Sequence, residues 1–262
     1  MLKYGMLAKA VELLCFKPSL TRLAELQPDM DMAAYKKKVQ KEYREMFLRT
    51  PDIGGSSLEM NLYIAAFVFS LHKAEPARIT PAVVDEMVTA VFDSPFMIKA
   101  HKNKKCTLFT DKVQDKKLAE SKASQHSPYE LDWKFIYEKG VDESYNTYTE
   151  CGICKLGKRE NCFAFVACLC NMDERNYRNE GGQLHRTKTL ANGDDCCNFH
   201  VTRIKIKYKG KHLSETVDAF FCICIIAQTD IPYKRYIKGY IPRLPICTWT
   251  FCCGQRYTAE WH

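Results

Sequence analysis

The chain has 262 residues, enough for one well-packed domain that needs no disulfide bonds for its stability. Its 39 basic and 31 acidic side chains leave a formal net charge of +8, but the lysines occur in short runs without a recognition motif, so we expect no nucleic-acid partner. The longest apolar run, residues 219–227, is about half of the ~20 residues that a membrane-spanning helix requires, so we expect no membrane partner either.

Fourteen cysteines are many for a chain of this length. The N-terminal residues lack the apolar run and small-residue cleavage site of a secretory signal, which predicts a cytoplasmic protein. Disulfide bonds are rare in that compartment. We therefore expect reduced thiols that serve catalysis, metal binding or burial.

Apolar residues at intervals of three and four predict an amphipathic helix over residues 32–49. Residues 58–73 are apolar nearly all round, which is typical of a central buried helix. His72, at its end, is interpreted as a cap or surface residue. A Thr-Pro pair predicts the start of a third helix over residues 80–92, whereas the lysine-rich residues 99–128 predict a mobile connection or a weak helix.

Aromatic and β-branched residues predict strands over residues 133–139 and 144–153. Residues 159–173 have the spacing of a helix that places Cys162 and Cys170 along one side. We expect this cysteine-bearing helix to pack on a small antiparallel sheet.

Residues 184–190 and 199–208 both alternate between apolar and polar side chains, and Asn192-Gly193-Asp194 between them is a strong turn signal. The two segments therefore predict a hairpin. The predicted fold class is α+β, with N-terminal helices followed by the small antiparallel sheet. The predicted organisation is a helical part over residues 1–130, an α+β core of the same domain over residues 131–210, and an atypical tail over residues 211–262.

The tail carries no acidic residue between Asp230 and Glu260, and three prolines interrupt it. Such a composition fits either a lid or the product of an altered reading frame. The sequence leaves both interpretations open, and it leaves the oligomeric state open as well.

Three motifs lie close together in the chain: Cys170-x-x-Asp173, Arg186-Thr-Lys-Thr-Leu-Ala-Asn-Gly193 and Cys197-Asn198-Phe199-His200. In them the chain resembles the L-2-amino-thiazoline-4-carboxylic acid hydrolase family, whose members carry C-x-x-D, R-T-x-T-L-A-x-G and C-D-F-[RH]. The resemblance covers residues 35–201, more weakly upstream of the motifs. Asn198 stands where the family has an aspartate, which removes a carboxylate from beside a candidate nucleophile.

The resemblance implies a hydrolase that opens a 2-aminothiazoline ring to give a carbamoyl-cysteine, with a small-molecule substrate and no cofactor. A thiolate and an acid/base group suit a ring carbon that lies between two nitrogens and a sulfur. Cys197 is the expected nucleophile, Asp173 the expected base or partner of the amidine-like cation, and His185 or His200 the expected activator of the thiol. Residues three apart on a strand face opposite sides, so the pairing of Cys197 with His200 requires a bulge.

Arg186 is expected to hold the substrate carboxylate through a bidentate fork. Cys170, Thr187 and Asn198 are expected to complete the substrate site. We expect Cys170, Asp173, Arg186 and Cys197 to open onto one cavity.

Other interpretations use the same residues. Cys151-x-x-Cys154 has zinc-knuckle spacing, with Cys168 and Cys170 or Cys196 and Cys197 as further ligands, and the same pair suits redox sensing. Loss of the family aspartate at Asn198 fits a non-catalytic binding protein. Cys197 is also interpretable as a small buried strand residue, and Asp173 as a helix cap.

Overall fold

The computed structural model describes residues 1–102, 106–204, 249–250 and 256–257. The chain divides into two units, Met1–Ile206 and Lys207–His262. In the second unit the described residues are β5 (Trp249–Thr250) and β6 (Arg256–Tyr257), which pair antiparallel. The rest of the predicted tail over residues 211–262 lies outside the described residues.

The first unit begins with helices, and local capping explains two of their starts. The Asp31 side chain accepts hydrogen bonds from the backbone N–H groups of Ala33 and Ala34, and Thr80 accepts one from Val83. The predicted helices over residues 32–49 and 80–92 are thereby confirmed. The helices are α1 (Met6–Leu26), α2 (Met32–Arg49), α3 (Glu59–Ala74), α4 (Pro81–Phe92), α5 (Pro95–Lys102) and α6 (Asp111–Ser124).

Two of these helices were not fully determined by the sequence. Helix α1 was not predicted, because Pro18 lies inside it and Met6 and Leu13 are exposed apolar residues that blur its pattern. Helix α6 occupies much of the segment predicted as a mobile connection or a weak helix, so the helical alternative is the one that the structure has. It is anchored to the sheet through Ser121 and Ser124, whose hydroxyls both donate to the Phe135 carbonyl.

Helix α3 is central, as its composition predicted. Leu62, Ala65, Ala66 and Phe69 are all fully buried. The helix contacts α1, α2, α4 and α7. His72 at its end lies against the Phe165 ring, and its Nδ1 lies 2.8 Å from the Ile79 carbonyl oxygen, beyond the end of the helix.

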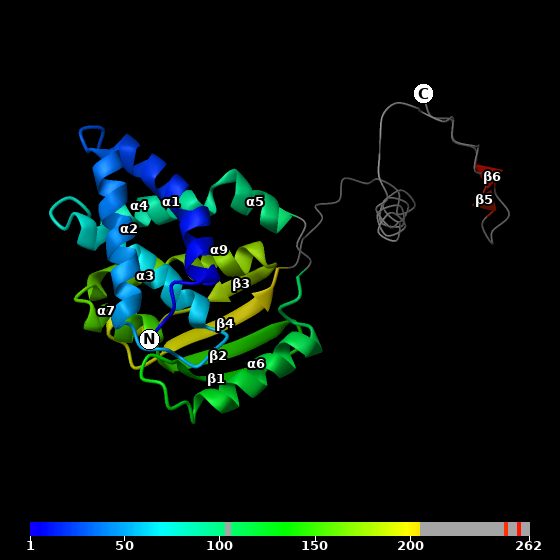
Figure 1. Ribbon diagram of the computed structural model, residues 1–262. Helices are drawn as coiled ribbons and strands as arrows, with labels where there is room; N and C mark the ends of the chain where they lie inside the picture. The colour runs from blue at the N-terminus through cyan, green and yellow to red at the C-terminus, as the bar shows by residue number, and fades with distance from the viewer. Residues whose placement is uncertain (103–105, 205–248, 251–255, 258–262) are drawn as a thin grey trace. The chain divides into compact units, whose positions relative to one another are not determined.

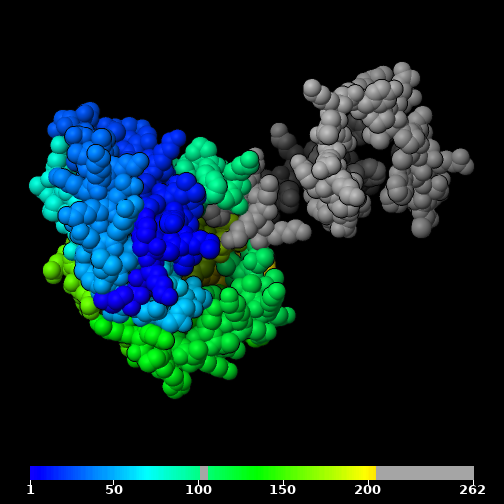
Figure 2. All heavy atoms as spheres, in the orientation of Figure 1, coloured from blue at the N-terminus to red at the C-terminus, as the bar shows by residue number. Residues whose placement is uncertain are grey.

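The sheet has four strands in the order β1-β2-β4-β3, all antiparallel. Figure 1 shows the N-terminal helices on one side of this sheet and α6 beside β1. Figure 2 shows the blue N-terminal helices and the green segment of α6 and β1 on the same face of the molecule. The α+β prediction is confirmed. The strands are β1 (Lys134–Lys139), β2 (Glu143–Glu150), β3 (Gly182–His185) and β4 (Cys197–Arg203).

Strand β3 is shorter than the predicted strand over residues 184–190. The Asn198 side-chain oxygen accepts hydrogen bonds from the backbone N–H groups of Thr187 and Lys188, and these replace ladder bonds. The chain then forms a 3-10 turn, η2 (Leu190–Asn192), and reverses at Gly193 with φ 90°. The predicted strand over residues 199–208 starts earlier, at Cys197, and its last residues lie outside the described ones.

The single helix predicted over residues 159–173 is wrong. Asn161 takes a left-handed conformation with φ 55°, which ends the preceding helix. The segment instead contains α7 (Gly152–Arg159), η1 (Phe163–Phe165), α8 (Val166–Cys170) and α9 (Met172–Asn179). Helix α8 carries two of the cysteines and contacts η2, and α9 packs on β3. Within the described residues, no helix is long and apolar enough to cross a membrane.

Candidate functional site

Strand β4 divides the predicted site residues between two faces of the sheet. Cys197 and Val201 are 6% and 0% exposed and belong to the inner face, which the helices cover. Side chains alternate along a strand, so Asn198 and His200 belong to the opposite, outer face. The pairing of β4 with β2 and β3 is in continuous register, so no bulge brings Cys197 and His200 to the same side.

The two histidines form a group on the outer face. They are paired across β3 and β4, with ring centroids 5.3 Å apart. The His200 ring stacks on Tyr145 at 4.3 Å and its Nε2 lies 2.9 Å from a Glu143 carboxylate oxygen, while His185 Nε2 lies 3.1 Å from the Thr202 hydroxyl. The predicted activation of Cys197 by either histidine therefore has no geometric basis, because the sheet lies between them.

Asn198 and Thr187 fasten the connection between β3 and β4. The Asn198 side chain accepts two backbone N–H bonds and donates a third bond to the Thr187 hydroxyl at 2.9 Å. The Asn198 side chain thus makes hydrogen bonds within the chain, one of them with Thr187. Substrate contacts had been predicted for both residues.

Arg186, by contrast, joins two of the predicted residues on the inner face. Its Nη1 donates to a carboxylate oxygen of Asp173 at 2.6 Å, and its Nη2 donates to the Cys170 carbonyl at 3.0 Å. The guanidinium also lies over the Phe199 ring, 5.0 Å from its centroid. The structure thus brings Cys170, Asp173 and Arg186 together, as predicted.

Asp173 is poised to exchange a proton near neutral pH. Burial raises its pKa from 3.8 to about 6, although the charge and hydrogen bond of Arg186 act in the opposite direction. A carboxyl with such a pKa suits general acid/base chemistry.

Cys197 and Cys170 remain protonated at neutral pH. Burial raises the pKa of Cys197 to about 11 and that of Cys170 to about 12. The Cys197 sulfur accepts one hydrogen bond, from the backbone N–H of Leu190 at 3.2 Å, which lowers its pKa too little to offset burial. Cys197 is therefore poorly suited to the predicted role of nucleophile.

Cys151 has the surroundings that Cys197 lacks. It is the N-cap residue of α7, at the positive end of the helix dipole, although its side chain accepts no capping hydrogen bond from the described residues. The neighbouring Cys154 side chain, the backbone N–H groups of Cys154 and Ile153, and the Trp133 side chain lower the pKa of Cys151, against the effect of burial. The neighbouring Cys151 and burial raise the pKa of Cys154. The first thiolate of the pair therefore forms on Cys151.

The sequence carried a signal for this site in the Cys-x-x-Cys motif, which was weighed only as a metal or redox motif. Its position at a strand-to-helix junction puts the first cysteine at a helix N-terminus. Cys154 feels the charges of Cys151, Cys170 and Cys197, and Cys197 feels those of Arg186 and Asp173. We call Cys151, Cys154, Cys170 and Cys197 the thiol cluster.

Within residues 1–102 and 106–204, no group of three or more His, Cys, Asp or Glu side chains is placed to hold a metal ion. Two of the cysteines in the zinc hypothesis also point elsewhere. The Cys168 thiol donates to the Pro81 carbonyl, and Cys196 interacts with Asp195 in the turn.

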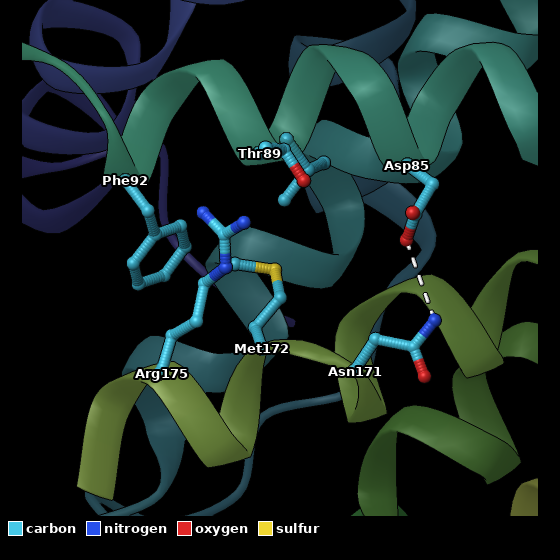
Figure 3. Close-up of a pocket in the computed structure, with 7 residues that line it drawn as sticks. Asp85, Thr89, Phe92, Asn171, Met172 and Arg175 are labelled. Carbon is cyan, nitrogen blue, oxygen red and sulfur yellow. Dashed lines mark hydrogen bonds between the residues drawn. The ribbon is translucent and has the colours of Figure 1, made fainter. Parts of the chain in front are cut away.

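A cavity of about 210 Å³ lies between α4 and the α8–α9 junction (Figure 3). Asn171 donates to Asp85 across it at 3.4 Å, while Arg175 is paired with Asp93 at 2.9 Å. A second cavity, of about 130 Å³, lies where the start of α2 meets the end of α3. Neither is lined by a predicted site residue, so the expectation of one shared cavity is not met there. The first cavity is lined by Asp85, Val88, Thr89, Phe92, Asn171, Met172 and Arg175.

Comparison with known proteins matched a family and solved structures. The family described as L-2-amino-thiazoline-4-carboxylic acid hydrolase matches residues 60–201, which run from α3 into β4 and make up more than half of the chain. No curated protein matched. A crystal structure of an Fe(II) unliganded H-NOX protein mutant from K. algicida aligns with 75% of this chain and 98% of its own, at 10% identity and a TM-score of 0.29.

Proposed function

Because this chain belongs to the L-2-amino-thiazoline-4-carboxylic acid hydrolase family, we propose that it hydrolyses a small cyclic amidine of the thiazoline type, with Cys151 as the nucleophile. The observation that carries this proposal is the environment of the Cys151 sulfur. Within the thiol cluster the pKa of Cys151 is lowered by the neighbouring Cys154 and by nearby N–H groups, whereas Cys151 and burial raise the pKa of Cys154, and burial raises those of Cys170 and Cys197. A thiolate is the reactive form of cysteine.

The reaction has two steps. In the first, the Cys151 thiolate attacks the ring carbon between the two nitrogens and the sulfur, the bond from that carbon to the ring sulfur breaks, and the departing sulfur takes a proton. In the second, water attacks the same carbon, the bond to Cys151 breaks, and a carbamoyl-cysteine leaves. Splitting a hard displacement into two easier steps is the benefit of a covalent intermediate.

Asp173 acts as the general acid and the general base of the reaction. Its pKa of about 6 lets it protonate the departing sulfur in the first step and accept a proton from the attacking water in the second. The bonds from Arg186 to Asp173 and Cys170 use two of its five N–H donors. The remaining donors bind the substrate carboxylate. The mechanism uses no cofactor and requires reduced thiols, which fits the cytoplasmic location predicted from the sequence.

Two cysteine variants test the nucleophile. The wild-type protein and Cys151→Ser and Cys197→Ser variants are incubated with L-2-aminothiazoline-4-carboxylate, and formation of the carbamoyl product is followed. We expect Cys151→Ser to lower kcat by at least about 10³-fold and Cys197→Ser to lower it by less than about tenfold. Cys15→Ser, in α1, is the matched control. Full turnover by Cys151→Ser overturns the proposal, and loss of turnover in Cys197→Ser alone returns the role to Cys197.

Asn198 favours a second candidate, a binding protein without hydrolytic activity. Its side chain is committed to hydrogen bonds with residues 187 and 188 and brings no carboxylate to the site. Binding without turnover, seen as a rise in Tm with added ligand and no carbamoyl product, supports this candidate.

A further inference from the structure

We propose that Cys151 and Cys154 form a reversible dithiol–disulfide couple that reacts with small disulfides by thiol–disulfide exchange. The couple itself is independent of the hydrolase proposal. Only its consequence rests on that proposal: oxidation consumes the thiolate of Cys151 and stops hydrolysis.

The geometry of the first turn of α7 brings the two sulfurs together. Cys151 is the N-cap residue with extended backbone, φ −124° and ψ 121°, and Cys154 lies three residues later on the same face. The two thiols are close enough for each to shift the pKa of the other. Two cysteines in this relation can close a disulfide bond without moving either backbone far.

The exposure of the two cysteines indicates that Cys151 reacts first and Cys154 second. Cys151 is partly exposed, whereas Cys154 is 7% exposed and packed in the core. A small disulfide therefore meets Cys151 first. Cys154 lies behind it as the resolving thiol.

The protonation of the pair supports the same order. The neighbouring Cys154 and nearby N–H groups lower the pKa of Cys151, and Cys151 together with burial raises that of Cys154. Cys151 is thus the attacking thiolate, and Cys154 holds its proton until the second step.

The exchange balances with oxidised glutathione as the oxidant. The Cys151 thiolate attacks one sulfur of the glutathione disulfide, the bond between the two glutathione sulfurs breaks, and one glutathione thiolate leaves. Cys154 then loses its proton to that thiolate and attacks the Cys151 sulfur, which releases the second glutathione. The two cysteines lose two electrons, and the glutathione disulfide gains them.

Two other cysteines are close enough to compete. Cys197 and Cys170 interact electrostatically with Cys151, but they belong to β4 and α8, whereas Cys154 lies in the first turn of the helix that Cys151 begins. The Cys197 sulfur also accepts a hydrogen bond from the Leu190 N–H. The shared helical turn therefore selects Cys151 and Cys154 as the pair.

The test is differential alkylation of the full chain after equilibration with mixtures of reduced and oxidised glutathione. Both cysteines lie in the segment Glu150-Cys-Gly-Ile-Cys-Lys155, so one proteolytic peptide reports the pair by mass. We expect this peptide to lose two hydrogens as the oxidised fraction rises and to regain them with dithiothreitol. In Cys154→Ser and Cys154→Ala we expect glutathione to remain attached to Cys151, because the resolving thiol is gone. Cys15→Ser is the control.

Two outcomes overturn the couple. One is a peptide that stays fully reduced while the added glutathione is mostly oxidised. The other is a disulfide from Cys151 to Cys170 or Cys197 in place of Cys154. Peptide mapping needs no substrate, so the couple is decided even if the protein does not hydrolyse thiazolines. If the couple fails while turnover still depends on Cys151, only this inference is lost.

Discussion

At the residue scale, the chemistry of each cysteine depends on the donors around its sulfur. Cys151 lies at a helix N-terminus, where Cys154 and nearby N–H groups lower its pKa, whereas Cys197 accepts one backbone N–H in a buried site. The two thiols interact electrostatically, yet their pKa values move in opposite directions. The surroundings that stabilise a thiolate on Cys151 therefore do not stabilise one on Cys197.

Asp173 gives a prediction at this scale. Its pKa in the folded protein, about 6, lies above the usual 3.8, so the folded state binds this proton more tightly than the unfolded state. The free energy of unfolding should therefore fall as pH rises from about 4 to about 6, by about 1–2 kcal/mol after allowance for partial exposure. Asp173→Asn should lack this component. Thermal unfolding at a series of pH values measures it, and parallel profiles for the two proteins would contradict the assignment.

At the scale of the element, α7 is held at both ends. Cys151 caps its start, and Glu160 at its C-cap is 5% exposed and accepts hydrogen bonds from Arg49. Gly152 allows the first turn to sit tightly on the preceding segment. A Cβ atom there would lie 2.2 Å from the Leu131 carbonyl oxygen and 2.8 Å from the Trp133 ring.

Gly152→Ala tests this dependence. The first turn of α7 must shift to relieve the overlap, which moves Cys151 relative to the groups that lower its pKa. We expect a loss of about 1–3 kcal/mol in the free energy of unfolding and slower alkylation of Cys151 by iodoacetamide at pH 7. Gly5→Ala is the control, because its Cβ would lie 3.8 Å from the nearest atom, an ordinary contact. Alkylation of Cys151 at the wild-type rate in Gly152→Ala would separate its reactivity from the helix start.

At the scale of the first unit, Glu160 joins three helices. Its carboxylate lies 2.9 Å from Arg49 Nη2 in α2 and 3.0 Å from Lys73 Nζ in α3, while its backbone ends α7. Burial alone would raise the pKa of Glu160, but the hydrogen bonds from Arg49 and Lys73 outweigh it and lower the pKa. The helical half and the segment that carries the thiol cluster are thus connected by one buried carboxylate.

Glu160→Gln should therefore destabilise the folded state. A lowered pKa means that the carboxylate contributes stability above its unfolded pKa and loses it as pH falls through the folded value. We expect a loss of about 1–3 kcal/mol near pH 7, because both cations are partly exposed, and a smaller difference from wild type near pH 3. Denaturant unfolding at the two pH values measures this. A loss that stays constant across pH would assign the effect to packing instead of charge.

The sequence by itself determined the elements whose signals are local. Helices α2 and α4 begin where Asp31 and Thr80 provide caps, and the β3–β4 connection reverses at Gly193, where a residue with positive φ is needed. Three short motifs also identified the family. Such features depend on residues a few positions apart, so they can be predicted from the amino-acid sequence alone.

Only the tertiary structure decided which sulfur is reactive and which groups surround it. Trp133 contributes to the lowered pKa of Cys151, Cys197 is buried, and the sheet separates His185 and His200 from Cys197. The contacts of Glu160 with Arg49 and Lys73 also join segments that are far apart in the sequence. A pKa depends on burial and on the nearest charges and dipoles, and these are set by packing between segments that no local pattern relates.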